Sequence, residues 1–277
     1  MARTVSHWQN EYGEQIYRVK QEVSHPKGCI GFVHGLGEHI GRYDHVFDFY
    51  ASQGYSCFGF DAYGHGKSDG KRGHVRSLLQ CMSEIDMLVN WMRTEHPALP
   101  VVLYGHSLGG NKVLTFSLQQ GNLPEATIST SPFIGEGTPS SALKIGAGKF
   151  LSNFFPKMLI ENGLPKNALS HDMEVNNHYY SDDLVHPKIS LKLGAVAFEA
   201  AEWLMEGSHT SKIPLLITHG DADQLTDFRT TEVFAAATKG DVTFKAWPGF
   251  FHETHNEVDK QAVFDYTLNW INKKLSL

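Results

Sequence analysis

The stretch Val101-Val-Leu-Tyr-Gly-His-Ser-Leu-Gly-Gly110 joins a short apolar run to a glycine-rich turn. The run follows Pro100 and stops at Gly105, which predicts a buried strand. Ser107 then lies at the centre of a Gly-x-Ser-x-Gly pattern, whose small residues allow a sharp turn from strand to helix. We therefore expect Ser107 at a helix N-terminus, where backbone N–H groups face any developing negative charge. This pattern favours a nucleophilic serine, and a plain glycine-rich turn is the alternative interpretation of the stretch alone.

Composition places the chain among ordinary globular proteins. It has 277 residues, of which 41% are hydrophobic and 12% aromatic, enough for one large core with a sizeable insertion. The formal net charge of −6 argues against a nucleic-acid partner and against attraction to anionic membranes. The three cysteines are far apart and favour buried apolar roles, and neither an apolar leader nor an 18-residue apolar run is found. We expect a reducing, cytoplasmic location.

Strand-like and helix-like patterns alternate along both ends of the chain. The predicted strands are 15–23, 29–33, 55–60, 101–105, 126–130, 213–218 and 242–247. The predicted helices are 42–53, 77–95, 228–238 and 257–273. Such alternation predicts an α/β fold with a mostly parallel sheet covered on both faces. The alternation ceases from 131 to about 212, so we expect a core formed by residues 1–132 and 213–277 and an insertion at 133–212.

A nucleophilic serine needs an acid and a base, which should follow later strand ends in the order acid, then histidine. The strand at 213–218 is followed by Asp221, Asp223 and Asp227. Asp227 precedes a helix and favours an N-cap role, while Asp221 lies close enough to the strand to brace the loop. We therefore predict Asp223 as the acid of the charge relay.

The base should follow the strand at 242–247. His252 comes first after two phenylalanines, and His255 is the second candidate. We predict that His252 is the base and that the N–H groups of Leu36 and Leu108 bind the substrate oxyanion. Leu36 lies in the turn His34-Gly-Leu-Gly37, which directly follows a predicted buried strand.

Three motifs that would indicate a bound ion or nucleotide fail on inspection. Gly66-Lys-Ser68 resembles the end of a P-loop, but Asp61 stands where the first glycine is required. The aspartates at 221–227 lack an acceptor at Leu225 and the glycine of a calcium loop. His252 and His255 are one residue too close for the zinc motif HExxH. We therefore expect no metal and no cofactor.

Several motifs together identify a family. His34-Gly-Leu-Gly-Glu-His39 with Gly41-Arg-Tyr43, the loop 61–68, the stretch 105–110, Gly220-Asp-Ala-Asp223 and His252 resemble the monoacylglycerol lipase branch of the α/β-hydrolases. The resemblance covers nearly the whole chain. Tyr180 to His186 is also similar to the cap of that family, although Asp183 stands where proline is expected.

The resemblance implies hydrolysis of a monoacylglycerol or similar lipid ester, with Ser107, Asp223 and His252 as the catalytic triad. It also implies a largely helical cap at 133–212 with an apolar tunnel for the acyl chain. Apolar residues at 143–160 have helical spacing, and Pro156 predicts a kink or a restart of the helix there. We predict that Phe150, Phe154, Phe155 and Met158 contact the substrate, with packing of the insertion on the core as the alternative. Peripheral membrane contact through this insertion is a further expectation.

Other functions are compatible with parts of the pattern. A lysophospholipase or a short-chain carboxylesterase would use the same three residues. A cofactor-free haloperoxidase fits less well because the insertion is large and apolar. A non-catalytic ligand receptor is disfavoured by the intact set of serine, aspartate and histidine, and a dehalogenase or epoxide hydrolase by the absence of aspartate at position 107.

Overall fold

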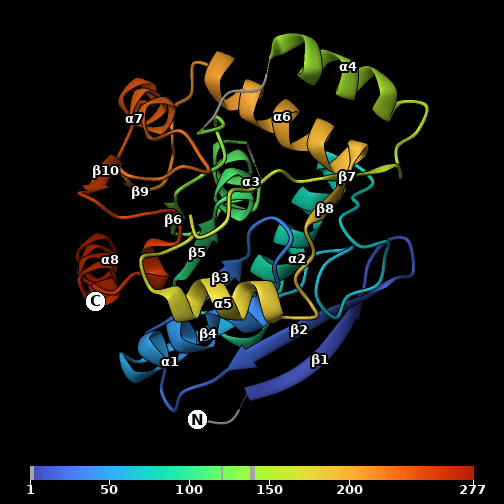
Figure 1. Cartoon of the computed structure of the whole chain (residues 1–277). Helices are drawn as coiled ribbons and strands as arrows, with labels where there is room; N and C mark the ends of the chain where they lie inside the picture. Colours follow the sequence, from blue (N-terminus) through green and yellow to red (C-terminus); the bar gives the residue numbers. More distant parts are fainter. Residues whose placement is uncertain (1–2, 120, 138–140) are drawn as a thin grey trace.

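The computed structural model describes residues 3–119, 121–137 and 141–277. Its centre is an eight-stranded sheet with the strand order β1-β2-β4-β3-β5-β6-β9-β10 (Figure 1). The strands are β1 (Arg3–Gln9), β2 (Gln15–Gln21), β3 (Gly28–Val33), β4 (Tyr55–Phe60), β5 (Val101–His106), β6 (Ala126–Thr130), β9 (Leu215–Gly220) and β10 (Val242–Trp247). The six strands from β4 to β10 are parallel, and β1 and β2 add an antiparallel edge. The predicted α/β class with a mostly parallel sheet is confirmed.

Helices cover both faces of this sheet. They are α1 (Asp44–Ser52), α2 (Leu78–Glu95), α3 (Leu108–Leu118), α7 (Phe228–Ala237) and α8 (Lys260–Leu275). Alternate residues of β5 contribute to opposite cores, since Val102 and Tyr104 pack with α1 and α8 while Leu103 packs with α2 and α3. Burial on both faces is the reason that these strands are continuous apolar runs.

Local capping determines where the helices begin. The Ser77 hydroxyl accepts a hydrogen bond from the N–H of Gln80 at 3.1 Å and starts α2. The carboxylate of Asp227 accepts from the N–H of Thr230 at 2.5 Å and starts α7. Asp227 is therefore an N-cap, as its position in the sequence predicts.

Two segments differ from the sequence-based expectation. Strand β1 is not predicted, because it is a polar edge strand with few buried side chains. The helical pattern over 143–160 extends beyond the observed helix α4 (Ala142–Ser152), and Leu159–Glu161 forms strand β7 instead. Pro156 has no backbone N–H to donate a helical hydrogen bond, which explains why the helix does not continue.

The chain between β6 and β9 leaves the sheet and forms a separate group of elements. These are α4, β7, α5 (Met173–Ser181), β8 (Lys188–Ser190) and α6 (Leu191–Glu206). β7 and β8 pair as a small antiparallel sheet, and α6 packs between α4 and α3 (Figure 1). This arrangement brings α6 above the carboxyl ends of the parallel strands, where α/β sheets bind their ligands.

None of the helices in the described ranges is long and apolar enough to cross a membrane. The cysteines Cys29, Cys57 and Cys81 are buried with free thiols. Burial raises the pKa of Cys29 to about 12, which makes its thiol unreactive.

Candidate active site

Ser107 occupies a sharp turn between β5 and α3. Its backbone has φ 55° and ψ −119°, a left-handed conformation that costs energy in a residue with a Cβ atom. The N–H of Ser107 donates to the carbonyl of Thr130 at 2.9 Å, which holds the turn on the neighbouring strand. The side chain is partly exposed and lines a cavity. The strained turn presents Ser107 to this cavity at the start of a helix, as the Gly-x-Ser-x-Gly pattern predicts.

Steric contact explains the glycines around the serine. A Cβ atom at Gly105 would lie 2.4 Å from the carbonyl oxygen of Gly109. A Cβ atom at Gly109 would lie 2.1 Å from the carbonyl oxygen of Val33. Helix α3 can therefore approach β5 and β3 this closely only because both positions lack a side chain.

Asp223 lies in the loop after β9 and contacts His252. Its Oδ2 atom lies 2.7 Å from Nδ1 of His252, and its Oδ1 atom accepts from the backbone N–H groups of Leu225 and Thr226 at 2.7 and 3.1 Å. Burial would raise the pKa of Asp223, but the charge of His252 and the hydrogen bonds from His219 and His252 hold the pKa below its usual range. Asp223 is therefore ionised beside His252.

The other two aspartates of this loop have different contacts. Asp227 caps α7, and the Oδ1 atom of Asp221 accepts from the N–H of Gly249 at 2.6 Å. The structure therefore brings Asp223, the predicted acid, to the predicted base, and Asp221 braces the loop.

His252 and His255 differ in their surroundings. Burial would lower the pKa of His252, but the charge of Asp223 and its hydrogen bond raise it above the usual value. Burial lowers the pKa of His255 to about 3, and its ring stacks on Tyr43 with the centroids 5.1 Å apart. His106, whose ring centroid lies 4.7 Å from that of His252, also has its pKa lowered by burial. Among these three histidines, His252 is the one paired with a carboxylate.

The turn at residues 34–37, which contains Leu36, passes directly beside Ser107. A Cβ atom at Gly35 would lie 3.2 Å from the Cβ atom of Ser107. The N–H of Gly35 donates to Oε1 of Glu38 at 2.6 Å, which orients the turn. Leu36 and Leu108, the predicted oxyanion donors, line the same cavity as Ser107 and His252.

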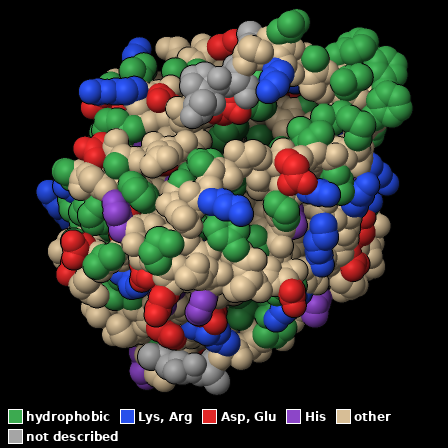
Figure 2. Space-filling model, viewed as in Figure 1, with side chains coloured by type: hydrophobic (Ala, Val, Ile, Leu, Met, Phe, Trp, Pro, Cys, Tyr) green, Lys and Arg blue, Asp and Glu red, His purple; other side chains and the backbone are tan. Residues whose placement is uncertain are grey.

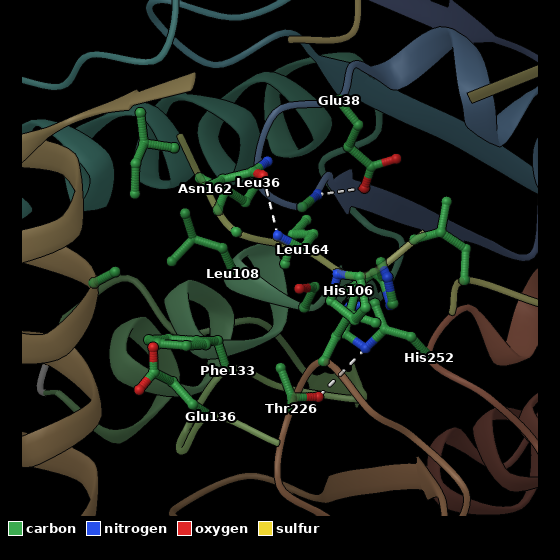
Figure 3. A pocket seen from close by; sticks show the side chains of 18 of the residues that line it. Leu36, Glu38, His106, Leu108, Phe133, Glu136, Asn162, Leu164, Thr226 and His252 are labelled. Atoms are coloured by element: carbon green, nitrogen blue, oxygen red, sulfur yellow. Dashed lines mark hydrogen bonds between the residues drawn. The ribbon is translucent and has the colours of Figure 1, made fainter. Parts of the chain in front are cut away.

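The cavity has a volume of about 350 Å³, and its largely apolar lining also includes the polar side chains of Glu136, Asn162 and Gln224. Figure 3 shows His106, His252 and Thr226 close together, and Leu36, Leu108, Leu164 and Phe133 around the same space. Further apolar lining comes from the chain between β6 and β9, namely Leu169, Ile189, Leu193, Ala197 and Phe198. An extended apolar group with one polar end fits this lining.

The predicted substrate contacts of the insertion require a correction. Phe150, Phe154, Phe155 and Met158 do not line the cavity, and they are 64%, 63%, 58% and 46% exposed. They lie on or just after α4, which packs against α6, and it is α6 that contributes Leu193 and Ala197 to the cavity. A helical period shows that one face of α4 is apolar, but only the packing against α6 determines that this face points outward.

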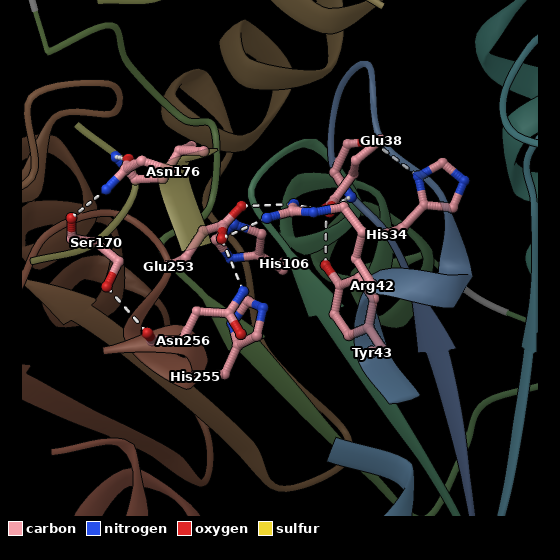
Figure 4. Close-up of polar contacts among 12 residues, drawn as sticks. His34, Glu38, Arg42, Tyr43, His106, Ser170, Asn176, Glu253, His255 and Asn256 are labelled. Carbon is pink, nitrogen blue, oxygen red and sulfur yellow. Dashed lines mark hydrogen bonds and ion pairs between the residues drawn. The ribbon is translucent and has the colours of Figure 1, made fainter. Parts of the chain in front are cut away.

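A buried ion-pair network that the sequence did not predict lies next to the site (Figure 4). Arg42 pairs with Glu38 and, through both terminal nitrogens, with Glu253 at 2.6 and 2.7 Å. Tyr43 donates to Oε1 of Glu38 at 2.8 Å. Glu38 and Glu253 line the cavity, and the guanidinium of Arg42 keeps the pKa of Glu253 well below its usual range despite burial. Glu38, Arg42 and Tyr43 belong to the motif at 34–43, which is the signal that could have revealed them.

In the ranges that the structure covers, no group of three or more histidine, cysteine, aspartate or glutamate side chains is arranged to hold a metal ion. Ser107 and His252 line the cavity, and His252 is hydrogen-bonded to Asp223.

Comparison with known proteins assigns the family. A family model described as serine aminopeptidase, S33, matches residues 24–259. The chain is 30% identical over 258 residues to a monoacylglycerol lipase of Mycolicibacterium smegmatis, covering 92% of both chains. It is 35% identical to an abhydrolase domain-containing protein of Dictyostelium discoideum, of whose length it spans only 27%.

Solved structures agree with this assignment. The crystal structure of Paleococcus ferrophilus monoacylglycerol lipase superposes with a TM-score of 0.85 and 29% identity, covering 94% of this chain and 99% of the other. The chain therefore belongs to the serine aminopeptidase S33 family and is a monoacylglycerol lipase-like α/β-hydrolase, an enzyme that hydrolyses carboxylic esters.

Proposed function

We propose that this hydrolase cleaves monoacylglycerols to a free fatty acid and glycerol through an acyl-enzyme on Ser107. The observation that carries the proposal is one cavity that is lined by Ser107 and by His252, the partner of Asp223, and whose remaining lining is largely apolar. One acyl chain can lie along the apolar side chains while its ester carbonyl reaches the serine.

In the first step His252 removes the proton of the Ser107 hydroxyl, and the serine oxygen attacks the ester carbonyl. The charge on the resulting oxyanion is stabilised by the N–H groups of Leu36 and Leu108. His252 then gives its proton to the departing glycerol oxygen, which leaves the acyl chain on Ser107. Asp223 keeps the His252 ring in the orientation and tautomer that this transfer needs.

In the second step a water molecule replaces glycerol. His252 removes a proton from the water, the hydroxide attacks the acyl carbonyl, and the proton is returned to the serine oxygen. The fatty acid leaves and the starting state is restored. This chemistry uses no metal and no cofactor.

We further propose that residues 133–212 form the cap of the enzyme. Supporting this, the cavity that Ser107 lines also receives side chains from this segment, namely Leu164, Leu169, Ile189, Leu193 and Phe198. The segment would then select the substrate, because it supplies most of the apolar surface that an acyl chain touches.

The outer face of α4 supports a peripheral contact with lipid. Leu143 is 84% exposed, and with Phe150, Phe154, Phe155 and Met158 it forms an apolar surface that we call the α4 face. Figure 2 shows hydrophobic side chains gathered where α4 lies. Monomeric soluble proteins seldom expose large apolar patches without a partner. We propose that the α4 face rests in a lipid surface, close to where monoacylglycerols are found.

A hydrolysis profile tests the proposed substrate. Initial rates are measured for monoacylglycerols, diacylglycerols, triacylglycerols and lysophospholipids that all carry the same kind of acyl group. The native enzyme and Ser107→Ala are compared. We expect monoacylglycerols to be preferred and Ser107→Ala to be inactive and unlabelled by a fluorophosphonate probe. A preference for lysophospholipids would contradict the proposed substrate while leaving the chemistry intact, whereas labelling of Ser107→Ala would contradict the nucleophile.

A further inference from the structure

The Oδ2 atom of Asp223 receives more than the hydrogen bond of His252. The Thr226 hydroxyl donates to it at 2.8 Å, and Nε2 of a second histidine, His219, lies 2.9 Å away. The side chains of both His219 and Asp223 have no exposed surface. Two imidazole rings therefore share one buried carboxylate oxygen.

The tautomer of His219 follows from its other nitrogen. Nδ1 of His219 is buried and has no hydrogen-bond partner among the residues that the structure describes. A proton on Nδ1 would be a buried donor without an acceptor, which is costly. The tautomer with its proton on Nε2 is therefore favoured, and that proton points to Oδ2 of Asp223.

The two kinds of donor come from different parts of the fold. The N–H groups of Leu225 and Thr226 belong to the same loop as Asp223. His219 belongs to β9, a strand bonded on both sides, with β6 and β10 as its neighbours, and it pairs with Ala246 of β10. The edge of its ring also contacts Phe228, with centroids 5.8 Å apart. His219 thus ties the carboxylate of a loop residue to the sheet.

We propose that His219 is a positioning residue, whose Nε2–H holds Oδ2 of Asp223 toward His252 so that the base keeps its productive orientation. This role rests on the proposed charge relay of Ser107, His252 and Asp223. It acts through Asp223 and makes no contact with the substrate, since His219 does not line the cavity.

The test compares two substitutions at one position. His219→Leu removes the donor, whereas His219→Gln keeps an N–H donor on a side chain of similar reach. We expect kcat for a soluble p-nitrophenyl ester to fall about 10- to 100-fold in His219→Leu with KM changed less than about twofold, because misaligned catalytic groups affect the chemical step. His219→Gln should recover most of that loss. If His219→Leu does not fold, His219→Phe, whose ring fills a similar space without a donor, replaces it.

The same comparison is then made in an Asp223→Asn background, where removing His219 should have little further effect on kcat. His209→Leu is the matched control, since His209 also contacts aromatic rings but follows α6 and does not line the cavity. Thermal unfolding of each variant separates a loss of alignment from a loss of folded protein.

Several results would overturn this role. A normal kcat for His219→Leu beside an inactive Asp223→Asn would remove the role of His219 and leave the charge relay standing. Equal losses of kcat in His219→Leu and His219→Gln would also remove the role of His219. So would an effect of His219→Leu on kcat that is undiminished in the Asp223→Asn background. Near-normal activity of Asp223→Asn alone would overturn the charge relay itself and the role of His219 with it.

Discussion

Arg42 donates to both carboxylate oxygens of Glu253, at 2.6 and 2.7 Å, although the two residues are 211 positions apart in sequence. Glu253 directly follows His252, and the second partner of Arg42, Glu38, accepts the N–H of Gly35 in the turn beside Ser107. The pair therefore connects the loop of the base to the turn that holds Leu36.

Replacing Arg42 tests how much this network stabilises the fold. In Arg42→Gln the carboxylates of Glu38 and Glu253 remain buried without their shared cation, so the free energy of unfolding should fall by about 3–5 kcal/mol. Denaturant unfolding measures the change. Arg229→Gln is the control, because Arg229 pairs with Glu232 on the surface with 79% of its side chain exposed and should have little effect. Equal stability of the two variants would contradict this account of the network.

The pH dependence of the rate should follow the pKa of His252. A general base works in its neutral form, and Asp223 raises the pKa of His252 despite the opposing effect of burial. The value of kcat/KM should therefore rise as the pH increases through a pKa above that of an ordinary histidine. Asp223→Asn removes the carboxylate charge, so the acid limb should move to lower pH while kcat falls on the order of 10⁴-fold. A pH–rate profile of both enzymes checks this, and an unmoved limb would argue against Asp223 as the partner of the base.

A larger side chain at Gly194 should shorten the acyl chain that the cavity accepts. Gly194 is on α6 and lines the cavity, and the nearest atom to a Cβ at this position is Cδ1 of Ile189 at 3.7 Å. Gly194→Leu can therefore be accommodated, with its added atoms taking up apolar space. We expect kcat/KM to fall about tenfold or more for long-chain esters and to change little for an acetate ester, because burial of each methylene is worth about 0.8 kcal/mol.

The control for Gly194→Leu is Gly148→Leu on α4. A Cβ atom at Gly148 has no neighbour within 4 Å, so this substitution adds the same atoms outside the cavity. Rates are compared across a series of p-nitrophenyl esters. A parallel loss for all chain lengths would mean that Gly194 does not border the acyl site.

The α4 face should govern attachment to lipid. The double variant Phe150→Ser, Phe154→Ser removes two rings that are 64% and 63% exposed, so its partition to phosphatidylcholine vesicles should fall about tenfold or more. Sedimentation with the vesicles measures the bound fraction. Leu79→Ser serves as the matched control, since Leu79 is 73% exposed at the start of α2, outside the α4 face. Equal binding by the double variant and the native chain would exclude this face as the point of contact.

Much of the core could be predicted because its signals are local. Apolar runs bounded by glycine or proline mark β3, β4, β5, β6 and β9, since a strand buried on both faces needs no polar side. Ser77 and Asp227 mark helix starts because a capping side chain bonds to a backbone N–H only three residues away. The order of strands and helices then predicts the parallel sheet.

Sequence-based prediction fails where the contacting residues are far apart in the sequence. The end of α4 differs from the expectation because Pro156 stops the helix, and β1 is missed because a polar edge strand has no apolar run. The apolar stripe of α4 could equally face a substrate cavity or solvent, and the way α4 packs on α6 leaves Leu143 and Phe150 in solvent. His219 has no distinguishing sequence pattern, because its proposed role depends on the position of the Asp223 carboxylate in the folded chain.

The sequence by itself determined the strained turn at Ser107, the candidate acid and base after β9 and β10, and the α/β class, since each depends on short-range sterics or on periodicity. Only the tertiary structure decided that Asp223 meets His252, that Arg42 meets Glu253, and that residues from α6 line the cavity. The physical reason is that these contacts join segments that only the folded sheet brings within a few ångströms of one another.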